Sequence, residues 1–176
     1  MPGSQPTVLI LASGRGARFI ASGGTGSKLD AMLHGKSVLQ HTRDAVQASG
    51  LPYHVERGPH LGMGDAIAAA VRATPDAAGW LILPGDLPLI QPETLRVVAL
   101  ALADQAAVVP TFEGQRGHPV GFSLQCRTEL EALKGNRGAA PVLAVYNAIE
   151  LVVNDPGAVT DIDTLDDLYR VALQLA

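Results

Sequence analysis

The chain has 176 residues, of which 47% are hydrophobic and 17% are charged, a composition that excludes an intrinsically disordered protein. Its net charge of −4 argues against a general nucleic-acid binder, and no apolar stretch approaches the roughly 18 residues of a membrane span. The N-terminus lacks the pattern of a signal peptide, and a single cysteine, Cys126, fits a reducing compartment, so we expect a cytoplasmic location. Cys126 is expected to be a small core residue rather than a nucleophile.

Strands and helices are expected to alternate along the chain. The run Thr7–Ala12 is continuously apolar between Pro6 and Gly14, which is typical of a buried parallel strand. Further strands are expected over residues 51–56, 79–84, 106–112, 118–124 and 149–154. Helices are expected over residues 37–49, 65–74, 92–104, 127–134, 138–146 and 163–176, with Ser37 and Asp65 as N-caps of the first two.

This alternation predicts a three-layer α/β fold with a mostly parallel sheet, in one domain over residues 1–176. Ligands of such sheets bind beyond the carboxyl ends of the strands. The loops after Ala12 and Leu83 are therefore the first places where we expect a site.

The first loop, "LASGRGARFIASGGTGSK" (residues 11–28), matches neither the Walker pattern nor the complete dinucleotide pattern. Gly14 and Gly16 would allow a close approach of the backbone to phosphate oxygens, which Arg15, Arg18 and Lys28 would neutralise. The alternative is a surface loop whose basic residues are solvated.

Three aspartates are candidate metal ligands. Asp86 in "LPGDLP" follows a buried strand between two prolines, as a Mg²⁺ ligand would, or it caps its own turn. In "TDIDTLDD", Asp161 and Asp163 point to one side if the segment is extended. Alternatively, Asp163 or Thr164 is the N-cap of the last helix.

Glycines and basic residues mark three further segments. Gly62 and Gly64 precede a helix, where backbone donors favour an anion or a nucleobase edge, or they form an ordinary turn. In "GQRGHPVGF", Arg116 and His118 are suited to a polar or anionic acceptor, although a lone histidine is more often structural. "GNRGAAPVL" adds Arg137, or is only a turn.

Taken in order, these motifs resemble the MobA/MocA-like nucleotidyltransferases, which include enzymes that attach CMP or GMP to molybdopterin. The resemblance covers nearly the whole chain. The matching segments are "LASGRGARF…SK", "LGMGDAIAAAV", "PGDLP", "RGHPVGFS", "GNRGA" and "DIDTLDDL". The resemblance implies a modified Rossmann-like fold of the nucleotide-diphospho-sugar transferase type, with seven strands or a shortened version of that sheet.

The resemblance also implies roles for individual residues. The catalytic residues would be Arg18, Lys28 and Asp86, and the metal ligands Asp86 with Asp163 or, less favoured, Asp161. The nucleotide would contact Leu11, Ala12, Ser13, Gly14, Arg15, Gly16, Lys28, Gly62, Gly64, Asp65, Pro84 and Gly85. The acceptor would contact Arg116, His118, Asn136 and Arg137.

The implied reaction is a Mg²⁺-dependent transfer of NMP from CTP or GTP to a molybdopterin-type acceptor, with release of pyrophosphate. Two alternatives stay open: transfer to another phosphorylated acceptor such as a sugar phosphate, and a regulatory nucleotide-binding protein without turnover. A molybdoenzyme chaperone is a partner that this acceptor would allow. No nucleic acid or membrane is expected as a partner.

The chain also departs from the family's pattern. Ser13 stands where the family has Ala or Gly, and Asn136 and Ala140 replace an Asp and an Arg. Arg18 and Lys28 lie ten positions apart, farther than in the family, and "IASGGTG" (residues 20–26) carries the excess. We expect this insertion to be a mobile flap that becomes ordered when NTP binds.

Overall fold

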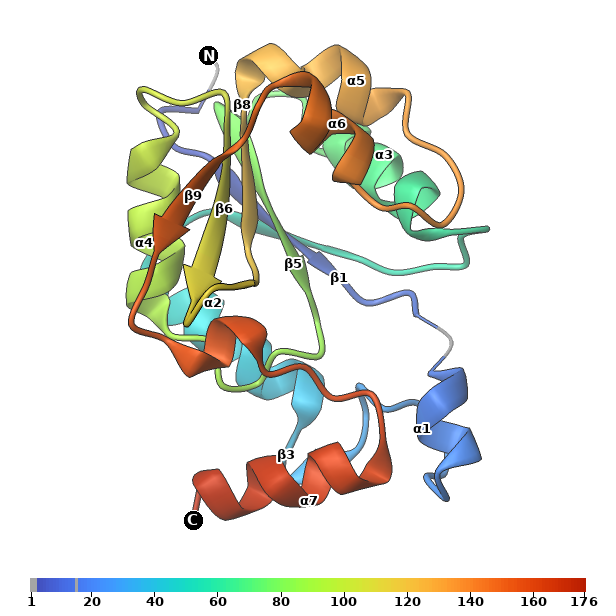
Figure 1. Ribbon diagram of the computed structural model, residues 1–176. Coiled ribbons are helices and arrows are strands. Elements are labelled where there is room, and N and C mark those ends of the chain that lie inside the picture. Colours follow the sequence, from blue (N-terminus) through green and yellow to red (C-terminus); the bar gives the residue numbers. More distant parts are fainter. Residues whose placement is uncertain (1–2, 15) are drawn as a thin grey trace.

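A mixed sheet of seven strands lies at the centre of the computed structural model, which describes residues 3–14 and 16–176 (Figure 1). The strands are β1 (Thr7–Leu11), β4 (Tyr53–Glu56), β5 (Gly79–Pro84), β6 (Ala107–Phe112), β7 (Gln115–Arg116), β8 (Val120–Ser123) and β9 (Ile149–Val152). Their order is β4-β1-β5-β8-β6, and β7 and β9 also pair with β6. β7 and β8 are antiparallel to their neighbours, whereas the other pairs are parallel. The mostly parallel sheet expected from the sequence is confirmed.

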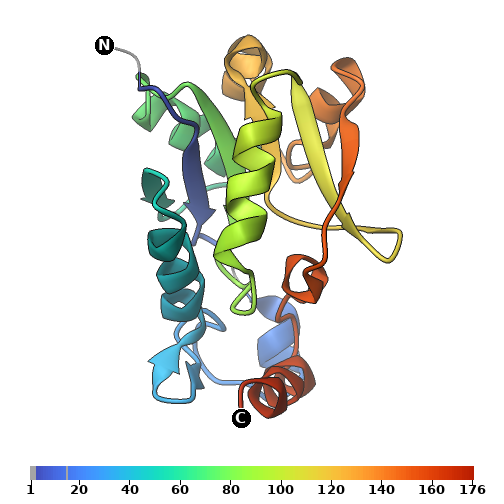
Figure 2. The same ribbon diagram turned by 90° about the vertical axis from the view of Figure 1, so that its left-hand side faces the viewer.

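Helices cover both faces of the sheet and complete the three expected layers (Figures 1 and 2). One face carries α2 (Val38–Ser49) and α4 (Pro92–Ala101), and the other carries α3 (Met63–Ala73), α5 (Arg127–Glu131) and α6 (Ala140–Val145). Two more helices, α1 (Ala17–Ala21) and α7 (Leu165–Gln174), lie below the carboxyl ends of the strands in Figure 1. None of the described helices is long and apolar enough to cross a membrane.

The first strand shows why its sequence is continuously apolar. Val8 and Ile10 enter the hydrophobic core that contains residues of α2 and α4, whereas Leu9 and Leu11 enter the core that contains residues of α3 and α5. Side chains alternate between the faces of a strand, so a strand covered on both faces has no polar side. β1 is therefore anchored on both faces, and the loop after Leu11 starts from a fixed point.

Some elements differ from the sequence prediction. The short α1, the two-residue strands β2 (Met32–Leu33), β3 (Lys36–Ser37) and β7, and the 3₁₀ turns at Leu124–Cys126 and Pro156–Val159 are too short to leave a periodic pattern. Predicting Asp65 as the N-cap of α3 was wrong, because the helix begins at Met63 with Gly62 as its N-cap. Of the eleven other predicted elements, seven end one to three residues earlier than expected and four end where expected.

The start of α7 resolves an alternative that the sequence leaves open. Thr164 is the N-cap: its hydroxyl accepts from the Asp167 N–H at 3.2 Å, and the Asp167 carboxylate accepts from the Thr164 N–H at 2.8 Å. The same carboxylate accepts from the Asp163 N–H at 3.0 Å. This capping box occupies Thr164 and Asp167, so the Asp163 carboxylate is not used as a cap.

Candidate active site

The candidate site lies at the carboxyl-terminal edge of the sheet, where three distant segments meet. Pro84 at the end of β5 pairs with Leu11 at the end of β1, and the Gly85 N–H donates to the Leu11 carbonyl at 2.9 Å. The Asp86 carbonyl accepts from the Ile162 N–H at 3.0 Å, which draws the segment before α7 to the same edge. Backbone hydrogen bonds therefore hold Asp86 between the first loop and the closing segment.

Three carboxylates converge at this edge. Asp86, Asp161 and Asp163 each contribute an oxygen atom, and these oxygens lie within 4.8 Å of one another. Asp86 is buried, and its Oδ1 has no hydrogen-bond partner among the described residues. Burial and the charges of Asp86 and Asp163 raise the pKa of Asp161. A buried carboxylate oxygen without a partner, beside two further acids, fits the oxygen ligands that a divalent cation requires.

Lys28 and Arg18, which the sequence predicts on the phosphates, contact these carboxylates here. Lys28 Nζ lies 2.7 Å from Asp86 Oδ2 and 3.2 Å from Asp163 Oδ1. Arg18 Nη1 lies 2.8 Å from Asp163 Oδ2. Burial lowers the pKa of Lys28, but the Asp86 and Asp163 carboxylates outweigh it, so the pKa is raised overall. The protonated Lys28 thus balances part of the negative charge of the three acids.

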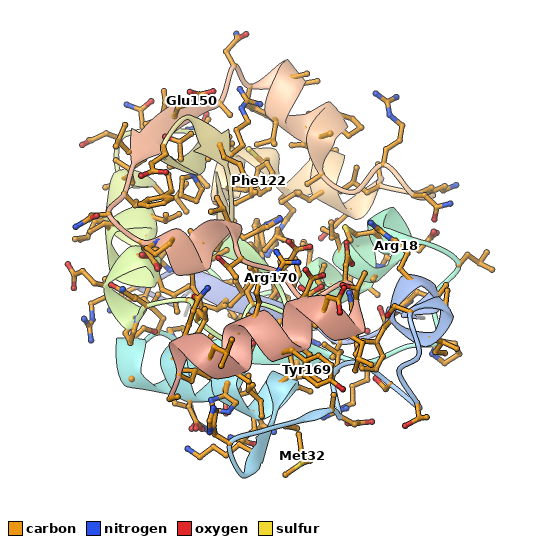
Figure 3. All side chains as sticks on the ribbon, turned by 60° about the horizontal axis from the view of Figure 1, so that its bottom comes forward. Arg18, Met32, Phe122, Glu150, Tyr169 and Arg170 are labelled. Atoms are coloured by element: carbon orange, nitrogen blue, oxygen red, sulfur yellow. The ribbon has the colours of Figure 1, made fainter. Side chains whose placement is uncertain are left out.

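The two cations differ in how firmly they are held. The Lys28 side chain is only 15% exposed, whereas the Arg18 side chain is 78% exposed. Arg18, labelled in Figure 3, belongs to α1. An exposed ion pair contributes little, because water and salt screen it. Arg18 can therefore reach another anion at small cost, whereas the two carboxylates hold Lys28 more firmly.

Asp86 lines a cleft of about 440 Å³, which we call the nucleotide cleft after the residues predicted to bind nucleotide. Of the residues predicted to bind nucleotide, Leu11, Ser13, Gly14, Lys28, Gly62, Pro84 and Gly85 line it. Ala12, Gly16, Gly64 and Asp65 do not line it, and Arg15 lies outside the described residues. The backbone donor of Gly64 is already used, because its N–H donates to the Gly135 carbonyl at 2.8 Å. The Asp65 carboxylate likewise accepts from the Gly135 N–H at 3.0 Å.

Asp86 also lines a second cleft, of about 330 Å³, which we call the acceptor cleft because Arg116 and His118, predicted to contact the acceptor, line it. Lys28, Met63, Pro84 and Asp86 line both clefts. Arg18, Asp161 and Asp163 line only the acceptor cleft. The two clefts therefore meet at Lys28 and Asp86, so that two bound molecules could meet there.

The four residues predicted to contact the acceptor are separated by the fold. Arg116 and His118 line the acceptor cleft, Asn136 lines the nucleotide cleft, and Arg137 lines neither of them. Arg116 Nε also lies 3.0 Å from Glu150 Oε1. Burial lowers the pKa of His118 despite the nearby Asp86 charge, and its Nδ1 has no hydrogen-bond partner among the described residues. Arg116 and neutral His118 thus offer a cation and a neutral imidazole to one molecule.

Sequence reasoning missed several residues of the nucleotide cleft. Leu29, His60, Leu61, Met63 and Ala66 all line it. The His60 ring is fixed by Glu56, whose Oε1 lies 2.9 Å from His60 Nε2. The other carboxylate oxygen of Glu56 lies 2.7 Å from His54 Nε2. The spacing in "HVERGPH", two histidines around one glutamate, is the signal that could have pointed to this segment.

The inserted segment after Arg18 is attached to the start of α7. Phe19 is buried, and the Ser22 hydroxyl donates to the Phe19 carbonyl at 2.8 Å. The same hydroxyl oxygen accepts from the Leu165 N–H at 2.9 Å, which ties the segment to the residues that follow Asp163. Ordering of residues 20–26 by NTP stays a prediction, but the segment has a defined anchor.

Cys126 is a core residue, as expected. It is fully buried in the hydrophobic core beneath α3 and α5 and lines neither cleft. Burial, together with the charge of Glu129, raises the pKa of its thiol to about 11. A thiol that stays protonated at neutral pH is a poor nucleophile.

Comparison with known proteins gives one family match and several relatives. Residues 42–151 match the model of the MobA-like NTP transferase domain, a range that includes Asp86 but not the first loop, Asp161 or Asp163. The purine catabolism protein PucB of Bacillus subtilis (strain 168) is 30% identical over 166 residues, which cover 84% of this chain and 78% of PucB. The bifunctional protein GlmU of Alkalilimnicola ehrlichii is 33% identical over 123 residues, 56% of this chain. The match covers only 25% of that GlmU.

Solved structures share the fold at lower identity. A nucleotidyl transferase from Methanothermobacter thermautotrophicus has a TM-score of 0.80 at 19% identity, over 99% of this chain and 100% of that chain. Rv0371c of Mycobacterium tuberculosis H37Rv, in complex with manganese, has a TM-score of 0.76 at 23% identity, over 98% of this chain and 100% of that chain. Molybdopterin-guanine dinucleotide biosynthesis protein A from Archaeoglobus fulgidus has a TM-score of 0.70 at 22% identity, over 96% of this chain and 98% of that chain. At these identities the likeness shows the fold alone.

Proposed function

The chain belongs to the MobA-like NTP transferase domain family, and we propose that it transfers a nucleotidyl group from CTP or GTP to a phosphate-bearing acceptor. As the sequence predicts, it is a nucleotidyltransferase. The base, the acceptor and the use of Mg²⁺ are the parts that we propose. The main support for the proposal is the pair of clefts that meet at Asp86 and Lys28.

The geometry suits a direct transfer between two bound substrates. With NTP in the nucleotide cleft, its phosphates would reach Lys28 and Asp86, which line both clefts. An oxygen of the acceptor phosphate would attack the α-phosphorus and form a new P–O bond. The bond from the α-phosphorus to the bridging oxygen would break, and pyrophosphate would leave with that electron pair. The attacking phosphate is already ionised, so no side chain has to remove a proton.

Charge neutralisation is the main task of the protein in such a transfer. Lys28 would leave its carboxylate partners and move to the phosphates of the leaving pyrophosphate, and the exposed Arg18 would follow. Asp86, Asp161 and Asp163 would hold a Mg²⁺ ion. When bound, Mg²⁺ would withdraw charge from the phosphate oxygens at the reacting centre. Support for a divalent cation comes from the unpartnered Asp86 Oδ1 and from the manganese complex of Rv0371c.

A molybdopterin-type cofactor is the acceptor that we propose. It carries a phosphate, which suits Arg116 in the acceptor cleft, and the resemblance in sequence points to it. The Archaeoglobus fulgidus neighbour, whose name refers to molybdopterin-guanine dinucleotide biosynthesis, supports the same choice. A sugar phosphate is the second candidate, supported by the match to part of GlmU. A molybdoenzyme chaperone as partner and a cytoplasmic location stay predictions.

Pyrophosphate release tests this proposal directly. Purified protein is incubated with Mg²⁺, molybdopterin and one of CTP, GTP, ATP or UTP, and pyrophosphate is measured over time. We expect release with CTP or GTP that depends on molybdopterin. Release with a sugar phosphate instead of molybdopterin would select the second candidate, and no release with any pair while NTP still binds would favour a regulatory protein.

A further inference from the structure

The turn between α5 and α6 packs against the N-terminus of α3. The Gly64 N–H donates to the Gly135 carbonyl at 2.8 Å, and the Gly135 N–H donates to the Asp65 carboxylate at 3.0 Å. These reciprocal bonds join residues about seventy positions apart in the chain. They fix the turn, and with it the neighbouring Asn136, relative to the nucleotide cleft.

The two glycines of "LGMGD" are there because this turn comes so close. A Cβ on Gly62 would lie 2.6 Å from the Asn136 Oδ1, and a Cβ on Gly64 would lie 2.8 Å from the Lys134 carbonyl oxygen. Real Cβ atoms do not approach other atoms to such distances. The Asn136 side chain therefore rests directly over the Gly62 backbone, at the wall of the cleft.

Asn136 presents free hydrogen-bonding groups to that cleft. It lines the cleft together with Ser13, Gly14 and Gly62, it is exposed, and its amide makes no hydrogen bond to another described residue. An amide offers both donors and acceptors without charge, which matches the edge of a nucleobase. Lys28 is the one basic side chain, Lys or Arg, among the described residues lining this cleft, so the phosphates belong at the Lys28 end.

The remaining wall supports the same orientation of the nucleotide. Leu61 and Met63 are exposed apolar residues on either side of Gly62, and both line the cleft. Apolar side chains beside a neutral amide suit the flat face and the polar edge of a base. We propose that Asn136 hydrogen-bonds the base of the NTP and helps to select it, rather than contacting the acceptor. This inference rests on the proposed function, because it requires an NTP in the nucleotide cleft.

Binding of NTPs and of pyrophosphate to the Asn136→Ala protein tests the inference. Affinities for CTP, GTP, UTP, ATP and inorganic pyrophosphate are measured by calorimetry in the presence of Mg²⁺. One lost hydrogen bond is worth about 1 kcal/mol, so the preferred NTP should bind roughly fivefold to tenfold more weakly. The ratio between the preferred NTP and the others should fall toward one. Pyrophosphate, which has no base, should bind as to the unchanged protein.

The control variant is Lys134→Ala, a change in the same turn at a side chain that does not line the nucleotide cleft. It should leave the base selectivity unchanged. An Asn136→Ala protein with unchanged selectivity would overturn the inference and leave the proposed function intact. Equal losses of affinity for NTP and for pyrophosphate would also overturn the inference, because the substitution would then disturb the whole cleft rather than the contact with the base. If the unchanged protein bound neither NTP nor pyrophosphate, the proposed function itself would fail.

Discussion

Lys28 Nζ lies 2.7 Å from Asp86 Oδ2, so a cation expected on the substrate's phosphates is paired with a carboxylate expected on the metal. Both side chains are mostly buried, at 15% and 13% exposure, so neither charge is fully solvated. The lysine supplies positive charge to the three acids. Binding of NTP would draw the lysine away and leave the acids free for a metal ion.

Replacing Lys28 by Met should strengthen metal binding in the absence of nucleotide. The ammonium competes with a divalent cation for Asp86 and Asp163, so its removal should raise the affinity for Mn²⁺ about tenfold, or roughly 1.4 kcal/mol. Free Mn²⁺ measured by electron paramagnetic resonance reports this affinity. The thermal midpoint should fall without metal, because three carboxylates lose their counter-ion, and should recover when Mn²⁺ is added.

Lys36→Met serves as the control for that change. Lys36 also pairs with an aspartate, Asp44 at 2.6 Å, but the pair is exposed and neither residue lines the nucleotide cleft or the acceptor cleft. It should alter neither the Mn²⁺ affinity nor the recovery of the midpoint. A Lys28→Met protein that bound Mn²⁺ no better than the unchanged protein would contradict the idea that lysine and metal compete.

Replacing Asp86 by Asn should abolish most of the turnover. The change keeps the shape of the side chain and removes the charge that faces both clefts. We expect pyrophosphate release to slow by at least about 100-fold, which corresponds to about 2.7 kcal/mol of the activation barrier. The exposed Asp44→Asn change should leave the rate unaltered. Full activity of the Asp86→Asn protein would rule out the assigned metal site.

Removing the cap of α7 should affect both stability and the metal site. Thr164→Ala breaks the capping box beside Asp163 and should cost about 1 kcal/mol of unfolding free energy, measured in urea. It should also weaken Mn²⁺ binding, because the box positions the Asp163 backbone. Ser37→Ala removes the N-cap of α2 and should cost a similar amount without changing Mn²⁺ binding. Equal Mn²⁺ affinities in the two variants would show that the cap has no part in the site.

Replacing either of two glycines of the nucleotide cleft by Ala should have different effects on stability. Gly62→Ala places a Cβ against Gly135 and Asn136, so it should destabilise the fold by about 1–3 kcal/mol and disturb base selectivity. Gly14→Ala meets no atom within 4 Å, so it should leave stability nearly unchanged. It should weaken NTP binding if the phosphates or base approach this backbone closely. Urea unfolding and calorimetry with NTP separate the two effects.

The thiol of Cys126 should be protected in the folded protein and should make stability depend on alkaline pH. Its pKa is raised from 9.0 to about 11 by burial, so the unfolded chain loses the proton first as pH rises. The folded state then binds more protons than the unfolded state, and unfolding free energy should fall as pH climbs from about 9 towards 11. Cys126→Ala should reduce this slope. A thiol reagent should react quickly only after denaturation, and rapid reaction of the native protein would contradict the burial.

Much of the fold and part of the site could be predicted from local sequence. β1 and β5 are continuous apolar runs, because both of their faces are covered, and such runs are visible without a structure. Asp86 could be found because it follows one of these strands. Short elements such as α1 could not be found, because five residues show no helical period and α1 depends on the burial of Phe19. The acceptor contact of Asn136 is predicted from the resemblance to a known family, and nothing in "GNRGA" shows which helix the turn rests on.

The sequence by itself determined the order of strands and helices, the loops that leave the carboxyl ends of β1 and β5, and the acids available there. Those properties come from hydrophobic patterning and from residue types, which are local. Only the tertiary structure decided that Lys28 pairs with Asp86 and Asp163, and that the Gly64 N–H donates to the Gly135 carbonyl rather than to a ligand. These relationships join residues more than fifty positions apart, and they arise from backbone hydrogen bonds and close packing between segments that no local pattern connects.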